Sequence, residues 1–212
     1  GLWSACPSPM AVASLGEGAH TVTVRGTDRA GNIGAQQFSW TIDRTAPRVT
    51  FTPHETIVND TTLPVVYSTS ETTTQECRVD NGDWAACTTS VAATTMGEGQ
   101  HTLFVRATDR AGNQTTNSTT WSVDLTPPVL AWNAKPTAVA TSSSATFSVS
   151  ATEDNLAYWC NLDGAGWRGC DSPVTFTGIA DGAHSILMRA FDAAGNRSSS
   201  IGYSWTIDAT AP

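Results

Sequence analysis

The sequence predicts an all-β chain built from tandem β-sandwich modules of about 80 residues, arranged as a linear array. The first observation is a repeat: the motif Asp-x-Ala-Gly-Asn occurs at residues 28–32, 109–113 and 192–196, at offsets of 81 and 83 residues. A fixed period of this size indicates copies of one small unit. The other two observations are runs of alternating apolar and polar residues, and turn residues between those runs.

The repeat also predicts where the modules begin and end. Each copy carries a Gly-x-His sequence, then the Asp-x-Ala-Gly-Asn motif, then a Trp three residues before an Asp, and finally Thr-x-Pro. The predicted domains are 1–46, 47–127 and 128–212. The last two are complete modules, whereas 1–46 is the C-terminal half of one, and we expect the chain to be a piece of a longer array. The half-module is expected to be truncated; the alternative is completion by another chain, which would make it an edge for self-assembly.

Alternation with a period of two places the strands within a module. Leu103, Val105 and Ala107 share one face of a strand, and Phe104 and Arg106 share the other. In the middle module the expected strands are 48–52, 63–70, 75–80, 83–87, 90–95, 101–108 and 115–123. Seven short strands in one module are typical of a β-sandwich.

Composition excludes two classes of function. The net charge is −8 and Lys135 is the single lysine, which argues against nucleic-acid binding because that affinity depends on basic residues. No run of 18 apolar residues is present, so the sequence predicts no membrane span in this segment.

The cysteines predict two disulfides. Cys77 and Cys87 are ten residues apart and flank an Asn-Gly turn signal, and Cys160 and Cys170 flank a Gly-rich turn in the same way. Cysteines equidistant from a turn face each other across two antiparallel strands. The alternative, paired zinc ligands, lacks a His or Cys to complete a tetrahedral set. Disulfides predict an oxidising compartment, either extracellular or at the cell surface.

Taken together, these motifs resemble bacterial immunoglobulin-like repeats. The resemblance rests on the cysteine hairpin with its Asp and Trp, Gly-x-His, Arg-Ala-x-Asp-x-Ala-Gly-Asn, and Trp-x-Ile/Val-Asp-x-Thr-x-Pro. It covers essentially the whole chain. It implies immunoglobulin-like β-sandwich modules in a large secreted or surface-anchored protein of the fibrillar adhesin type, outside the cell.

Most repeated polar residues have a structural interpretation. The Asp-x-Ala-Gly-Asn motif is expected to form a tight turn between the last two strands, since Asp accepts hydrogen bonds there and Gly and Asn tolerate positive φ. The repeated histidines have no nucleophile repeating beside them, and no catalytic or cofactor-binding residue is predicted. Trp3, Trp84 and Trp167 are expected to pack on the disulfides; the alternative is that they are exposed and stack on sugars.

Carboxylates gather where modules follow one another, and this predicts structural calcium at the two junctions. Antiparallel topology brings Asp43 toward Glu71 and Asp109, and it brings Asp124 toward a larger set comprising Glu153, Asp154 and Asp192, with Asn155 beside them. Ca²⁺ takes six to eight oxygen ligands and would neutralise their repulsion. The alternatives are solvation or pairing with Arg44 and Arg110.

The predicted function is a non-catalytic, structural and adhesive stalk, whose partners are neighbouring immunoglobulin-like modules of the same chain. Each sandwich would add on the order of 30–40 Å, and proline in the short linkers would limit bending. One alternative is a module that recognises a glycan or protein through exposed aromatics, with Tyr158 and Trp159 as the candidate ligand residues because the middle module has no counterpart to them. Another is accessory repeats of an extracellular enzyme.

Overall fold

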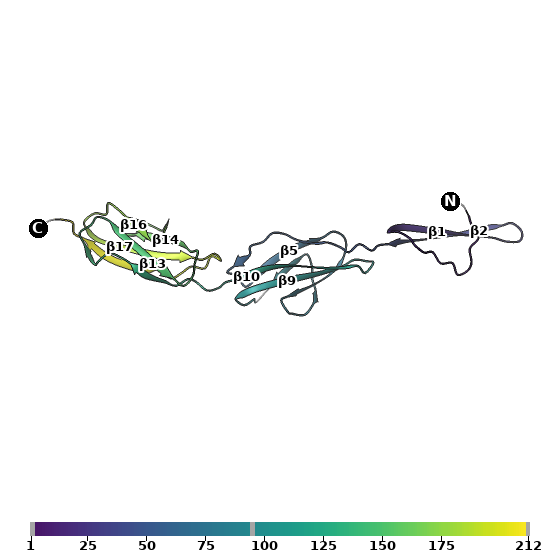
Figure 1. Cartoon of the computed structure of the whole chain (residues 1–212), viewed down its shortest axis with the longest axis horizontal. Coiled ribbons are helices and arrows are strands. Elements are labelled where there is room, and N and C mark those ends of the chain that lie inside the picture. Colours follow the sequence, from purple (N-terminus) through teal and green to yellow (C-terminus); the bar gives the residue numbers. More distant parts are fainter. Residues whose placement is uncertain (1–2, 94–95, 211–212) are drawn as a thin grey trace. The chain divides into compact units, whose positions relative to one another are not determined.

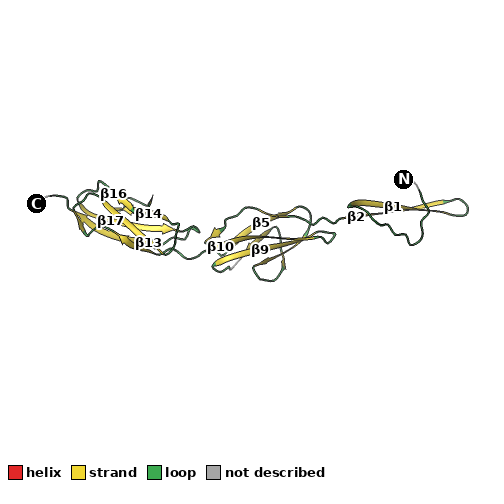
Figure 2. Cartoon of the chain, in the orientation of Figure 1, coloured by secondary structure: helices red, strands yellow, loops and turns green. Residues whose placement is uncertain are grey.

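The computed structural model describes residues 3–93 and 96–210. Within them every regular element is a β-strand (Figure 2). No described helix is long and apolar enough to cross a bilayer. The chain divides into two compact units. The first comprises Gly1–Thr52, Tyr67–Thr89 and Phe104–Ser118, and the second comprises Pro53–Val66, Ser90–Leu103 and Thr119–Pro212. The module boundaries near residues 46 and 127 remain a prediction.

The middle module contains a five-stranded and a three-stranded sheet. The larger sheet has the order β4-β10-β9-β6-β7 and the smaller one the order β3-β5-β8. Figure 1 labels β9 and β10 of the larger sheet and β5 of the smaller one. The strands are β3 Val49–Phe51, β4 Ile57–Val58, β5 Leu63–Thr69, β6 Thr74–Val79, β7 Ala85–Ala86, β8 Ser90–Ala93, β9 Gly99–Thr108 and β10 Gln114–Val123. All seven expected strands are present, although residues 94–95, predicted as the end of one, lie outside the described residues.

The third module repeats this topology strand for strand. Its sheets have the orders β12-β18-β17-β14-β15 and β11-β13-β16. The strands are β11 Leu130–Ala134, β12 Val139–Ala140, β13 Ala145–Ala151, β14 Ala157–Leu162, β15 Arg168–Cys170, β16 Val174–Phe176, β17 Gly182–Phe191 and β18 Ile201–Ile207. The matched topologies confirm the all-β fold of repeated immunoglobulin-like sandwiches.

The sequence did not predict one short strand in each of the two complete modules. β4 pairs in parallel with β10, with Ser122 N–H donating to the Thr56 carbonyl (2.8 Å), and β12 pairs in parallel with β18. Each of these strands has only two residues. Two residues carry no detectable period, so alternation could not reveal them.

The core of the third module lies between its two sheets. The three-stranded sheet contributes Leu130, Phe147 and Val149, and the five-stranded sheet contributes Ile186, Met188, Trp205 and Ile207. Phe147 is fully buried, and its ring centroid lies 5.0 Å from that of Trp205. Burial alternates along β17, as the period-two pattern predicts.

The N-terminal module is represented by a two-stranded sheet, β1 Gly18–Thr27 and β2 Ile33–Ile42. The strands pair antiparallel from Gly18↔Ile42 to Thr27↔Ile33. Val24 is 39% exposed, whereas Val105, which repeats it in the middle module, is fully buried. The apolar face of this hairpin thus matches a core face elsewhere in the chain. That the half-module is truncated stays a prediction, as does the alternative that another chain completes it.

Candidate functional site

The repeated Asp-x-Ala-Gly-Asn motif forms the tight turn that the sequence predicts. In the third copy, Asn196 donates from its backbone N–H to Asp192 Oδ1 (2.8 Å) and from its side-chain amide to Asp192 Oδ2 (2.9 Å). Asp109 and Asn113 make the same two bonds. The glycine of each copy has φ between 90° and 94°, a left-handed conformation that favours glycine.

In the first two copies, these hydrogen bonds favour the charged form of the turn aspartate. The pKa of Asp109 lies below its ordinary value: although desolvation opposes this, the hydrogen bonds from Asn113 favour the carboxylate. In the first copy, the amide and N–H of Asn32 lower the pKa of Asp28 in the same way. The turn therefore presents a fixed negative charge.

The asparagine of the turn also binds the end of the preceding repeat. Asn113 Nδ2 donates to the backbone carbonyl of Asp43 (3.1 Å), and Asn196 Nδ2 donates to that of Asp124 (2.7 Å). Each pair lies within one compact unit. The sequence analysis missed this second role, because the bonded residues are 70 and 72 positions apart.

Carboxylates surround each of these contacts. Asp43, Glu71 and Asp109 each offer an oxygen within 4.8 Å of the others, and so do Asp124, Glu153 and Asp192. The three acids of each group belong to one compact unit, the first group to one unit and the second group to the other. The structure thus brings together six of the seven acids predicted to hold calcium, while Asp154 does not join the second group.

The second group is electrostatically strained. Desolvation raises the pKa of Glu153, and the negative charges of Asp192, Asp124 and Glu98 raise it further.

Arg44, an alternative partner for the first group, donates instead to the carbonyl oxygen of Leu15 (3.3 Å). Three carboxylates suit a hard cation such as Ca²⁺, and calcium at the junctions stays a prediction.

The residues leading into each junction are anchored by a further repeated acid. Thr126 Oγ1 donates to Glu98 Oε1 (2.6 Å), and Thr45 Oγ1 donates to Glu17 in the same way. The prolines that follow, Pro47 and Pro128, are fully buried. These linkers are therefore held by side-chain bonds and by packing.

The repeated histidines have structural partners. Nε2 of His20, His101 and His184 lies 2.7–2.8 Å from a carbonyl oxygen four residues earlier. Each ring also lies 5.5–6.1 Å from the tryptophan of the facing strand. His184 Nδ1 additionally contacts Asp163 Oδ2 at 2.8 Å. These contacts agree with the structural interpretation of the histidines.

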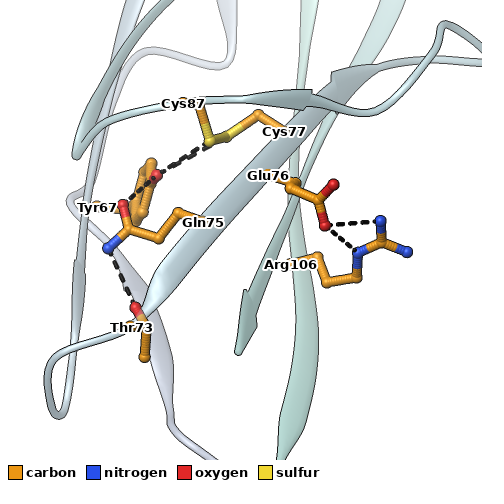
Figure 3. Close-up of a disulfide and its surroundings, with 7 residues drawn as sticks. All are labelled: Tyr67, Thr73, Gln75, Glu76, Cys77, Cys87 and Arg106. Carbon is orange, nitrogen blue, oxygen red and sulfur yellow. Dashed lines mark hydrogen bonds and ion pairs between the residues drawn. A yellow bond between two sulfur atoms is a disulfide. The ribbon is translucent and has the colours of Figure 1, made fainter. Parts of the chain in front are cut away.

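Both disulfides form between the cysteines that the hairpin spacing pairs, Cys77–Cys87 and Cys160–Cys170, with Cα separations of 5.7 and 5.9 Å. Figure 3 shows the buried hydroxyl of Tyr67, from the opposite sheet, between the first disulfide and Gln75. It donates to Gln75 Oε1 (3.0 Å) and lies 3.3 Å from Cys87 Sγ. Desolvation raises the pKa of Tyr67. Cys6, which repeats Cys87, is free and exposed.

The tryptophan at the repeated hairpin position stacks on an arginine that also repeats. In the two complete modules this arginine lies in β9 or β17, separated from the strand that follows the tryptophan by β6 or β14. The sequence predicted packing on the disulfide and not this contact. The guanidinium carbons of Arg25, Arg106 and Arg189 lie 4.5, 4.4 and 4.0 Å from the ring centroids of Trp3, Trp84 and Trp167. Cation–π attraction accounts for the preference, since the flat guanidinium matches the ring face. Arg106 also makes two bonds to Glu76 (Figure 3).

The two aromatic residues predicted as one ligand surface lie on opposite faces of β14. Tyr158 packs against the core of the third module, whereas Trp159 is 37% exposed. Neighbouring residues of a strand point to opposite sides, so the two rings do not stand side by side on one face, although both residues line the same shallow hollow. Trp159 alone remains available at the surface.

Comparison with known proteins supports the fold. A family model described as "Bacterial Ig-like domain" matches residues 45–125. No curated protein matches the chain. Solved structures resemble it at low identity. Fibronectin(III)-like modules of CbhA from Clostridium thermocellum share 15% identity over 76% of this chain and 94% of theirs, with a TM-score of 0.44.

Two adhesin structures resemble the chain at a similar level. A tetra-tandem repeat from the extending region of a large adhesion protein is 20% identical over 95% of this chain, with a TM-score of 0.38, and the chain spans 59% of its length. A 1.5-MDa bacterial ice-binding adhesin is 19% identical over 91% of this chain and 74% of its own, with a TM-score of 0.41.

Proposed function

We propose that the chain is a non-catalytic structural segment of a secreted or cell-surface bacterial protein, because a family model described as "Bacterial Ig-like domain" matches residues 45–125. Its role is that of a stiff stalk that sets the distance between the parts it joins. The observation that carries the proposal is the repeated contact in which the turn asparagine of one repeat binds the carbonyl of the Asp that ends the preceding one.

Three features support a stiff connection rather than a flexible tether. The linker prolines are buried, the linker threonines are held by Glu17 and Glu98, and the asparagine contact occurs at both junctions. A flexible linker would be exposed and rich in Gly or Ser. The two disulfides support an oxidising location outside the cell.

Small-angle X-ray scattering tests the proposal. The maximum dimension of wild-type protein should stay constant and match modules placed end to end, at on the order of 30–40 Å each. Doubly substituted Asn113→Ala/Asn196→Ala protein should show a broader distribution of distances, with unchanged circular dichroism. A wild-type envelope as broad as that of the variant would contradict the stalk.

A further inference from the structure

The middle and third modules differ at one outward-facing position of the larger sheet. Glu76 of β6 has Trp159 as its counterpart in β14, while Arg106 of β9 is repeated as Arg189 of β17. Trp159 and Arg189 are direct partners in the β14–β17 register. A carboxylate facing an arginine in one module has therefore become an aromatic ring facing an arginine in the other.

The exchange leaves Arg189 without a counter-ion. In the middle module Glu76 Oε2 accepts from Arg106 Nη2 (2.8 Å) and Nε (3.1 Å). Within the described part of the chain, no carboxylate lies within salt-bridge distance of Arg189, and its buried Nε has no hydrogen-bond partner. Three ring centroids lie within 6.0 Å of its guanidinium carbon, those of Trp159, Trp167 and Phe191.

The surface beside Trp159 is open. Gly169 of β15 stands opposite Trp159 in the register, so no side chain covers the sheet there. A hollow lies on the β15 side of Trp159, lined by residues 156–159 and 169–172, with Asp171 among them. Arg189 lies on the other side of Trp159, in β17. The hollow offers an aromatic face and a carboxylate that can accept hydrogen bonds.

We propose that this surface binds an acidic saccharide, a pyranose that carries a carboxylate. The C–H face of the sugar would stack on Trp159, whose ring face is electron-rich. The sugar carboxylate would pair with the guanidinium of Arg189, which favours two parallel bonds to such a group. The sugar hydroxyls would donate to Asp171. This goes beyond the structural role proposed above and does not depend on it.

The middle module is a natural control. Glu76 occupies the guanidinium of Arg106 there, and an incoming carboxylate would meet a like charge. Arg78 of that module also has a buried Nε without a partner, but its guanidinium lies between Phe104 and Trp84, at 4.6 and 5.1 Å. Its counterpart in the third module, Asn161, accepts instead from the turn at Gly166 (3.1 Å). Binding is therefore expected in the third module only.

Titration calorimetry with trimers of galacturonate, mannuronate and guluronate tests the site, and the methyl-esterified trimers provide matched probes without the charge. At least one acidic trimer should bind, and its ester should bind more weakly by about tenfold or more. Arg189→Gln and Trp159→Glu should each weaken binding by a similar factor, and Trp159→Glu recreates the Glu–Arg pair of the middle module, so it should remain folded. Arg106→Gln should leave binding unchanged.

Several outcomes would overturn the inference. These are failure of all three trimers to bind, esters that bind as tightly as the acids, a Trp159→Glu protein that still binds, or an Arg106→Gln effect as large as that of Arg189→Gln. Thermal melting of each variant separates loss of binding from loss of folding.

Discussion

Replacing Asn196 tests whether the turn asparagine joins successive repeats. Its side chain, only 9% exposed, donates to Asp192 Oδ2 and to the Asp124 carbonyl. A hydrogen bond to a charged group contributes about 1.5–3 kcal/mol and a neutral one about 0.5–1.5 kcal/mol. Asn196→Ala should therefore lower the free energy of unfolding by about 2–4 kcal/mol.

Asn196→Asp sharpens the test, because it keeps the size of the side chain and replaces the donor with an acceptor. Two carboxylates would then face each other about where the 2.9 Å bond now lies. At neutral pH this variant should be less stable than Asn196→Ala, and it should recover as acid protonates the pair.

Urea denaturation monitored by tryptophan fluorescence measures both variants. Asn32→Ala is the matched control, since it removes the equivalent bond to Asp28 at an exposed turn, where water replaces it. Its effect should stay below about 1 kcal/mol. If Asn196→Ala and Asn32→Ala lowered the free energy of unfolding by equal amounts, the contact with Asp124 would not contribute to stability.

Three further predictions concern the acids, the histidine and the disulfides. Millimolar Ca²⁺ should raise the melting temperature and EDTA should lower it, because the ion relieves repulsion at Glu153 and its neighbours. Glu153→Gln/Asp192→Asn should abolish the response, and a wild-type melting temperature that does not change with Ca²⁺ would exclude the site.

 
Desolvation and the charges of neighbouring acids raise the pKa of Glu153, so its ionisation opposes folding. His184 contacts two acceptors, Asp163 and the Ala180 carbonyl, and these raise its pKa above the ordinary 6.5. Desolvation opposes ionisation of Asp163, but the hydrogen bonds from His184 and the Ser185 N–H outweigh it and hold the pKa of Asp163 below the ordinary 3.8. His184→Gln should therefore lower the free energy of unfolding most between pH 3.8 and 6.5. The loss should become smaller as the pH rises through the raised pKa of His184 or falls through the lowered pKa of Asp163. If the difference in urea midpoint between the two proteins did not change with pH, the pairing would be refuted. Cys160→Ser/Cys170→Ser should lower the free energy of unfolding by about 2–3 kcal/mol, measured by urea denaturation, and an unchanged midpoint would count against the disulfide as a stabilising link.

Local patterns in the sequence were sufficient for the turns, the disulfides and the longer strands, but not for the two-residue strands β4 and β12. Alternation in β9 and β17 depends only on neighbouring residues, and a cysteine pair equidistant from a turn is brought together by hairpin geometry alone. The repeat added the topology of the third module once that of the middle one was known.

The acidic groups were predictable in part. Antiparallel topology places the ends of strands, so the approach of Asp124 to Glu153 and Asp192 follows from strand order. Strand order does not place individual side chains within a loop, and Asp154 accordingly falls outside the group that its neighbour Glu153 joins.

What the sequence by itself determined was therefore the periodic and local part of this protein: its longer strands, its turns and its cysteine pairs. Only the tertiary structure decided which distant groups meet. The bond from Asn196 to Asp124, the stack of Trp167 on Arg189 and the separation of Tyr158 from Trp159 all depend on how strands far apart in sequence lie beside each other. Such contacts arise from packing in three dimensions, and no short-range pattern records them.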